Sequence, residues 1–413
     1  MSTRGQELDG SSAASPVKEL LSDPNYRNFW IAQILAFGAN GTLRFTFVWL
    51  MVTLSDWSGA EGLIGIALGV PALLLALPAG AWSDRVDRSR FNLIWMGLGT
   101  IVLAVFSFVI ALDLVTPRIA GIAAVVLGGT LVMMQPNLNA MVPLLVAPER
   151  LMNAAALQNG GGQSAAFLGL AFGGGIIALF GNAAGFALLA IAMAVAFILM
   201  RRVDLPYVPH DGPTRRIRSE IAAGLRYGLG SEPRRSLLIA TFILGASFSV
   251  MQIAMPRVVE QDFGKGSLAA GILLGTFGLG MLVSSVVIAR GDIRNHGRNV
   301  AVFIGIGLGL GQFLLSLAPN YWVAVAVMVG WGINAGIAIA SHRTLLQQKT
   351  EPAMMGRVMG IMTLGFSGGL PIGALTQTVL SPAVGPVQTM RYVGLATMCL
   401  TIPLLFRSVV RTQ

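Results

Sequence analysis

The stretch GAWSDRVDRSRF, residues 80–91, shows how the chain is arranged, because it is a short charged turn between two apolar segments. The flanking segments, residues 62–82 and 91–112, are each long enough to cross roughly 30 Å of hydrocarbon at about 1.5 Å per helical residue. Apolar segments of this length alternate with short polar turns along most of the chain. The sequence therefore predicts an α-helical protein that crosses a membrane many times.

The composition agrees with a membrane protein. The 413 residues are 54% hydrophobic and 11% charged, against roughly 25% charged in an average soluble domain. A soluble fold this apolar could not cover its own surface, whereas in lipid the 51 glycines allow close helix packing. The one cysteine, Cys399, lies in the last apolar segment, so we expect no disulfide framework. Residues 1–24 are polar without a cleavable signal sequence, which makes the first helix the expected targeting signal.

Twelve transmembrane helices in two pseudo-symmetric halves of six are predicted. The expected organisation is a cytoplasmic tail (1–27), a six-helix bundle (28–200), a cytoplasmic linker (201–235), a second six-helix bundle (236–406) and a cytoplasmic tail (407–413). The two halves show an internal duplication, because PLLVAPERLMNAAAL after the fourth helix is similar to LLQQKTEPAMMGRVMG after the tenth. The predicted helices cover residues 28–54, 62–82, 91–112, 119–143, 154–180, 183–200, 236–256, 268–289, 299–317, 321–341, 357–379 and 388–406.

The basic residues orient these helices. With the N-terminus inside, 23 of the 28 Lys and Arg residues fall on the cytoplasmic side and four, Arg118, Arg257, Lys265 and Arg391, fall outside. The net charge of +10 therefore indicates orientation and not a nucleic-acid partner. In the linker, Ile217, Ile221 and Leu225 recur opposite four arginines, which predicts an amphipathic helix on the anionic inner leaflet; a solvated linker is the alternative. The four arginines are Arg215, Arg216, Arg218 and Arg226.

The charged turn resembles the signature between the second and third helices of the major facilitator superfamily. The matching residues are Gly80, Asp84, Arg85, Arg88 and Arg90. The resemblance implies that the glycine permits tight helix approach, and that Asp84 faces the N-terminus of the helix starting near Arg357 and latches the outward-facing state. Glu149 and Arg150 are expected to close this network, and the alternative is that these are ordinary orienting charges.

More of the chain resembles the drug and siderophore exporter branch, near the macrolide and enterobactin exporters. The resembling stretches are residues 25–38, 136–159, 220–235 and 356–375. They imply a monomeric, proton-coupled exporter of amphiphilic molecules in the bacterial inner membrane, working by alternating access. In the fifth helix Gly169, Gly173 and Gly174 match the antiporter motif, while Leu170 replaces its kinking proline. Asn40 stands where such exporters commonly carry an acid.

All 18 acidic residues fall in tails, loops or helix ends, with Glu149 and Glu260 nearest to the membrane interior. The deepest charge is Arg44, which shares one face of the first helix with Gln33, Phe37 and Asn40. Arg44 either contacts substrate, snorkels to the outer surface or pairs with a backbone carbonyl. Amides in later helices join the candidate cavity or bond between helices: Gln135, Asn139, Asn159, Gln163, Gln252 and Asn334. Such a cavity suits amphiphilic molecules that are neutral or weakly anionic.

No enzyme is predicted, because no cluster of polar side chains supplies a nucleophile with its base or a set of metal ligands. Residues 264–267, GKGS, lack the upstream glycine of a nucleotide-binding loop. We therefore expect no cofactor and no metal, and a small-molecule substrate and protons as partners. Two alternatives remain open: an uptake or facilitated-diffusion transporter of the same fold, and a non-transporting membrane receptor or scaffold.

Overall fold

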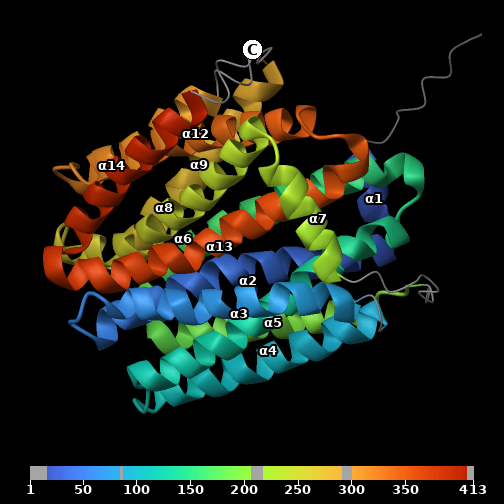
Figure 1. Cartoon of the computed structure of the whole chain (residues 1–413). Helices are drawn as coiled ribbons and strands as arrows, with labels where there is room; N and C mark the ends of the chain where they lie inside the picture. The colour runs from blue at the N-terminus through green and yellow to red at the C-terminus, as the bar shows by residue number, and fades with distance from the viewer. Residues whose placement is uncertain (1–15, 84–86, 206–216, 291–299, 407–413) are drawn as a thin grey trace, which may run out of the picture.

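A computed structural model describes residues 16–83, 87–205, 217–290 and 300–406. These residues form long helices whose axes are roughly parallel, joined by turns at both ends of the bundle (Figure 1). No strand occurs among them, which confirms the predicted all-α fold. In chain order the helices are α1 (Pro16–Ser22), α2 (Pro24–Leu54), α3 (Ala60–Ser83), α4 (Arg88–Ala111), α5 (Pro117–Leu145), η1 (Pro148–Arg150), α6 (Leu151–Met200), α7 (Ile217–Leu229), α8 (Glu232–Gln261), α9 (Ser267–Arg290), η2 (Val300–Leu308), α11 (Gly309–Leu315), α12 (Tyr321–Gln348), η3 (Pro352–Met354), α13 (Met355–Val384) and α14 (Pro386–Leu405).

The twelve predicted spans each correspond to a helical segment of the described chain. The fifth and sixth spans both lie in α6, which changes direction at Gly181, where φ is 82° and ψ is 176°. Such a positive φ is readily available only to glycine, so the residue fixes the turn between the two spans. The ninth span begins as the π-helix η2 and continues as α11.

The two halves repeat the same local structures at a constant spacing. The short 3₁₀ helix η1 begins at Pro148 and its counterpart η3 begins at Pro352, 204 residues later. Gly385, with φ 86°, follows Gly181 by the same 204 residues and separates α13 from α14. The similarity between the stretches around Pro148 and Pro352 therefore reflects a repeated helix–turn–helix unit in each half.

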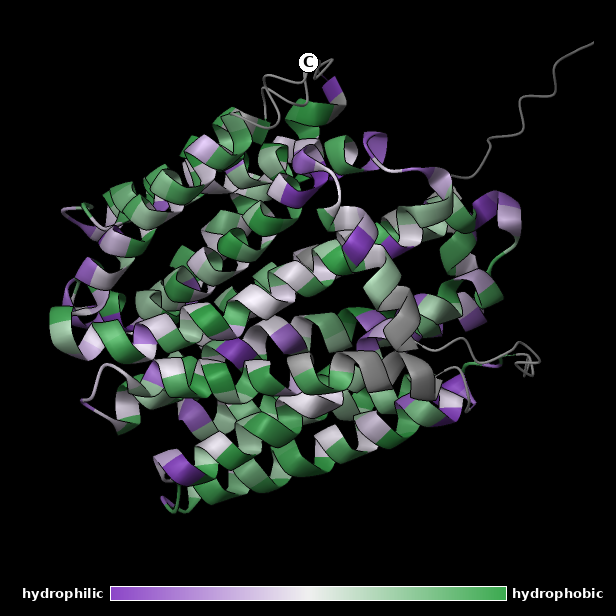
Figure 2. Cartoon of the chain, in the orientation of Figure 1, coloured by the Kyte–Doolittle hydropathy of each residue, from purple (hydrophilic) through white to green (hydrophobic). Residues whose placement is uncertain are grey.

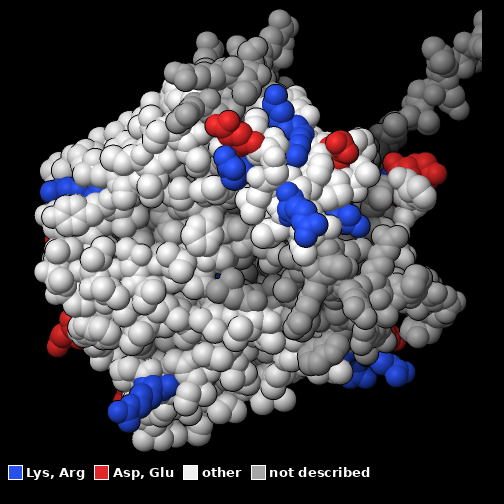
Figure 3. Space-filling model, viewed as in Figure 1, with Lys and Arg blue, Asp and Glu red and all other residues white. Residues whose placement is uncertain are grey.

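The surface has the polarity expected for a protein embedded in lipid. Eight helical stretches of the described chain are long and apolar enough to cross a membrane, and Pro148–Met200, with 53 residues, holds two spans. Figure 2 shows hydrophobic residues along the middle of the helices, with hydrophilic residues towards their ends. On the face shown in Figure 3, charged side chains lie near the two ends and leave a wide uncharged belt between them. This belt matches the hydrocarbon region of a bilayer.

The helix ends define two ends of the bundle. The end with the α2–α3 and α8–α9 connections is called the Glu61 end, and the opposite end, where α4 begins, the Arg88 end. At the Glu61 end a Cβ atom at Gly62 of α3 would lie 2.6 Å from the carbonyl oxygen of Ala374 on α13. In contrast, no described atom lies within 4 Å of a Cβ position at Gly160 or Gly356, towards the Arg88 end. Among these three glycines, the one at the Glu61 end is the one that packs closely against the opposite half.

Helix α7 lies at the Arg88 end and packs against the second half (Figure 1). Its contact face is formed by Gly224, beside Ile361 and Arg357 of α13, and by Gly228, beside Leu238 of α8. Leu225 is exposed, and the side chains of Ile217 and Ile221 are outside the described set. The glycine face, which the hydrophobic periodicity did not indicate, therefore holds this helix against the bundle.

Candidate functional site

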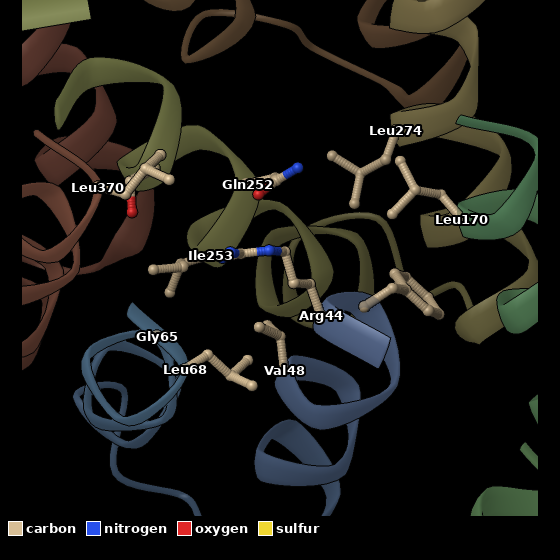
Figure 4. A pocket seen from close by; sticks show the side chains of 11 residues that line it. Arg44, Val48, Gly65, Leu68, Leu170, Gln252, Ile253, Leu274 and Leu370 are labelled. Carbon is tan, nitrogen blue, oxygen red and sulfur yellow. The ribbon is translucent and has the colours of Figure 1, made fainter. Parts of the chain in front are cut away.

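A cavity lies between the two halves (Figure 4). Its α2 residues, Arg44 to Val48, are closer to the Glu61 end of that helix than to its start. Helices α2, α3 and α6 of the first half and α8, α9 and α13 of the second half contribute to it. Three of its side chains are polar and the others are apolar or glycine. The lining residues are Arg44, Phe45, Val48, Gly65, Leu68, Leu170, Ser249, Gln252, Ile253, Leu274 and Leu370.

Arg44 carries the charge of this cavity. It lies ten residues before the last residue of α2, or about 15 Å from that end of the helix. Figure 4 shows its side chain extending from α2 towards Gln252 and Ile253 of α8. Its Nε donates a hydrogen bond to Oδ1 of Asn40, one turn earlier, at 3.3 Å. The structure therefore places Arg44 and Gln252, two of the predicted cavity residues, on opposite walls of one cavity.

A second cavity lies within the first half, between α2 and α5. Phe37, Asn40 and Gln135 line it, together with Ala36, Leu131, Met134 and Leu138. Because Asn40 also accepts the hydrogen bond from Arg44, this residue connects the two cavities. Gln33 lines neither of them, and its buried amide has no hydrogen-bond partner among the described residues.

Two of the predicted cavity amides form bonds between helices. Asn334 of α12 donates to the carbonyl oxygen of Phe303 in η2 at 3.0 Å, inside the second half. Asn139 of α5 accepts a hydrogen bond at 2.8 Å from Gln158 of α6, a residue not among the predicted ones. The side chains of Asn159 and Gln163 lie outside the described part of the chain.

A buried ion pair joins the halves at the Glu61 end, and sequence reasoning missed it. Nε of Arg257 on α8 donates to Oε1 of Glu61 on α3 at 2.5 Å, and the side chains are only 2% and 1% exposed. Nη2 of Arg257 also donates to the carbonyl oxygen of Ser55 at 2.6 Å, in the α2–α3 connection. One guanidinium therefore holds both a helix and a loop of the opposite half.

This pair corrects two expectations from the sequence. Glu61, and not Glu149 or Glu260, is the buried acid among the described residues. Arg257 was expected in an outside loop, but α8 continues to Gln261 and keeps its side chain inside the bundle. The remaining carboxylate oxygen of Glu61, Oε2, has no hydrogen-bond partner in the described structure.

The residues of the charged turn are only partly described. Asp84 and Arg85 lie outside the described residues, and Gly80 falls in the last turn of α3. Nη1 of Arg88 donates to the carbonyl oxygen of Ala140 on α5 at 2.8 Å, which ties the start of α4 to its neighbour. Arg90 lies 3.8 Å from the carboxylate of Asp87, the residue that caps α4.

The other residues of the predicted network lie at the same end of the bundle. Arg150 pairs with Glu19 of α1 at 2.5 Å, so its described ionic partner is in the N-terminal segment. Glu149 is exposed. Arg357 lies in the first turn of α13, as expected, and contacts the sulfur of Met354.

The glycines of the fifth span form contacts of two kinds. Gly169 packs against α2, where Oγ1 of Thr42 donates to its carbonyl oxygen at 2.8 Å. Gly174 faces the other half, where Oγ of Ser267 on α9 donates to its carbonyl oxygen at 3.0 Å. Gly173 lies beside Thr42, and between Leu151 and Gly181 the helix has no break at Leu170. This short stretch therefore packs the first half together and joins it to the second.

Comparison with known proteins shows the family to which the chain belongs. The model of the transmembrane secretion effector family matches residues 12–412, almost the whole chain. The chain belongs to this family. This family belongs to the major facilitator superfamily, whose signature the charged turn resembles. The twelve-helix fold of the chain is of the same type.

The similar curated proteins are transporters. The staphyloferrin A transporter of Staphylococcus aureus is 22% identical over 92% of this chain and 95% of its own length. The multidrug efflux pump Tap of Mycobacterium tuberculosis is 24% identical, covering 89% of this chain and 90% of Tap. The enterobactin exporter EntS of Shigella boydii is 24% identical, covering 94% of this chain and 92% of EntS.

Solved structures of the same fold include the nucleoside transporter NupG, with a TM-score of 0.69 at 16% identity over 94% of this chain and 98% of NupG. A structure of a POT family transporter has a TM-score of 0.70 at 16% identity, covering 94% of this chain and 97% of that one. These likenesses concern the fold alone. Together with the family, they identify the chain as a multi-pass membrane transporter of the major facilitator type.

Proposed function

We propose that this transporter exports amphiphilic small molecules by alternating access, with residues 28–200 and 236–406 moving as two bodies. The observation that carries the proposal is the cavity around Arg44, which both halves line, with the Glu61–Arg257 pair joining the halves one helical turn beyond the lining residues Gly65 and Ile253. A molecule in the cavity can leave at the Glu61 end only if this pair and the glycine contacts beside it separate.

The basic residues indicate which end of the bundle faces the cytoplasm. Arg118, Arg257, Lys265 and Arg391 lie at the Glu61 end, each within five residues of a helix terminus, and most other described Lys and Arg residues lie towards the Arg88 end. By the positive-inside rule, we place the Arg88 end in the cytoplasm and the Glu61 end outside, with both chain termini cytoplasmic. In this proposed orientation the buried Glu61–Arg257 pair lies on the outer side.

Export is favoured over uptake by the relatives, since a multidrug efflux pump and an enterobactin exporter each match along about nine-tenths of this chain. The apolar lining of the cavity, interrupted by Arg44, Ser249 and Gln252, suits an amphiphile better than a sugar, which needs many polar contacts.

Protons are the proposed coupling ion. The described lining of the cavity contains no acid, and Glu61 is the buried carboxylate among the described residues. A proton on its Oε2, which has no described partner, would neutralise Glu61 and weaken its attraction to Arg257. Proton binding from the outside would thereby favour separation of the outer ends.

Asp84 provides a test of the proposed movement. In an efflux-deficient host that expresses the transporter, we expect Asp84→Asn to slow export of fluorescent amphiphiles at least roughly tenfold at equal amounts in the membrane, because a charge in the latch would be lost. Asp113→Asn is the matched control, since Asp113 lies in a loop at the other end with φ 55°, a conformation that asparagine also adopts. Equal export by both variants would contradict the role of Asp84.

A further inference from the structure

We propose that the cavity around Arg44 binds an anionic group of the transported molecule, so that the preferred substrates are amphiphiles with one acidic group and an apolar body. This rests on the proposed function and specifies its substrate class. It follows from the position of Arg44, from its hydrogen bonds and from the charge of the cavity.

The position of Arg44 argues against a role at the membrane surface. About 15 Å of helix separates it from the end of α2, and its side chain extends across the interface towards α8 (Figure 4). A snorkelling arginine would instead extend along its own helix towards the aqueous boundary. The guanidinium therefore belongs to the interface between the halves, where a substrate passes.

The hydrogen bonds of Arg44 leave most of its donors available. Its Nε donates to Asn40, while Nη1 and Nη2 donate to no described residue, backbone carbonyls included. By comparison, Arg257 uses Nε and both terminal nitrogens on Glu61 and the α2–α3 connection. Within the described structure, Arg257 is a structural arginine and Arg44 has the donors that a ligand could use.

The described lining of the cavity supplies no negative charge to offset Arg44. None of the described lining residues is acidic, and Arg44 forms no ion pair with any described residue. The buried acid Glu61 is already bound to Arg257. A desolvated cation without a counter-charge is unfavourable. The Arg44 guanidinium would therefore attract an entering anion and repel an entering cation.

The guanidinium indicates which anionic group the ligand carries, and the apolar lining indicates the character of its body. A guanidinium presents two parallel N–H groups that match a carboxylate or phosphate. Around it, Val48, Leu68, Ile253 and Leu274 form apolar walls, and the amide of Gln252 lies on the side facing Arg44. The chemistry of the lining therefore matches an acid with an apolar chain, which the cavity would admit only after widening as the halves move.

A matched pair of fluorescent ligands tests the proposal. Dansylaminoundecanoic acid and its methyl ester share an apolar body and differ in one charge, and their binding is measured with the full-length transporter in phosphatidylcholine nanodiscs, after subtraction of empty nanodiscs. We expect the wild type to bind the acid at least roughly tenfold more tightly than the ester. Arg44→Gln should remove this preference and leave ester affinity within about twofold.

Two further variants separate ligand contact from folding. Arg44→Lys retains the charge without the planar guanidinium and should keep part of the preference for the acid. Arg118→Gln removes an exposed cation at the Glu61 end and should keep all of it. If Arg44→Gln does not give a monodisperse protein, binding of the corresponding dansylated amine to the wild type is measured instead. The amine should bind more weakly than the ester.

Three results would overturn the proposal: no preference for the acid in the wild type, a preference that survives Arg44→Gln, or an equal loss of acid and ester affinity in that variant. Export of neutral amphiphiles without any acid preference would refute the anionic substrate class and leave the proposed function standing. Acid binding that depends on Arg44, in a protein that exports nothing, would support the site and refute the proposed function.

Discussion

Glu61→Gln is expected to open the Glu61 end of the transporter. The change leaves the Arg257 guanidinium buried without its counter-charge, and breaking one side of a buried pair costs about 3–5 kcal/mol. Opening this end to water relieves the cost, so even 3 kcal/mol would shift the balance towards the open form by roughly 100-fold. Spin labels at Leu114 and Leu317, exposed residues of opposite halves at this end, should move apart in a Cys399→Ser background.

The matched variants make this prediction specific to the pair. The double variant Glu61→Gln with Arg257→Gln buries no uncompensated charge and should return the label distances towards those of the wild type. Glu260→Gln removes a partly exposed acid one turn from Arg257 on the same helix and should change the distances little. Unchanged distances in Glu61→Gln, or equal opening in the single and double variants, would show that the pair does not hold this end closed.

A single methyl group at Gly174 is expected to have a similar effect by steric means. Its Cβ would lie 2.4 Å from the carbonyl oxygen of Ser267 and 3.1 Å from Cα of Gly271, and these backbone atoms cannot move aside by changing rotamer. Overpacking of this kind costs about 1–3 kcal/mol and would act on the closed form, in which α6 and α9 touch. The same label pair should report opening in Gly174→Ala.

The neighbouring glycine provides the control. A Cβ at Gly175 would meet the flexible end of Leu268 at 3.6 Å, an ordinary contact, so Gly175→Ala should leave the distances unchanged. If both variants gave the same label distances, the close approach of α6 and α9 would have no part in closing the Glu61 end.

The helices could be predicted from the sequence because each apolar segment must satisfy its backbone internally in lipid. The observed helix bounds differ from the predicted ones where polar residues cap or extend a helix. Asp23 and Asp87 cap α2 and α4, so these helices begin before the first apolar residue, at Pro24 and Arg88. At the other side of the membrane α8 continues to Gln261, five residues past the predicted end, because a helix can extend beyond the hydrocarbon into the interface.

The candidate site was only partly accessible to sequence reasoning. Helical periodicity placed Arg44, Asn40 and Phe37 on one face, and they line the two adjoining cavities. Glu61 and Arg257 are 196 residues apart, and both stand at helix ends among other outside charges, so no local pattern indicates their pairing. For the amide of Asn334 the sequence left cavity lining and bonding between helices open. The packing of α12 on η2 shows that it bonds to the carbonyl oxygen of Phe303 inside the second half.

Export through the cavity between the halves is tested most directly with energised inside-out membrane vesicles. In these vesicles the Glu61 end faces the lumen if the proposed orientation is right. We predict that vesicles with the transporter accumulate dansylaminoundecanoic acid above vesicles without it, and that a protonophore abolishes the difference. No difference between the two kinds of vesicle, or accumulation that occurs only in right-side-out vesicles, would contradict the account.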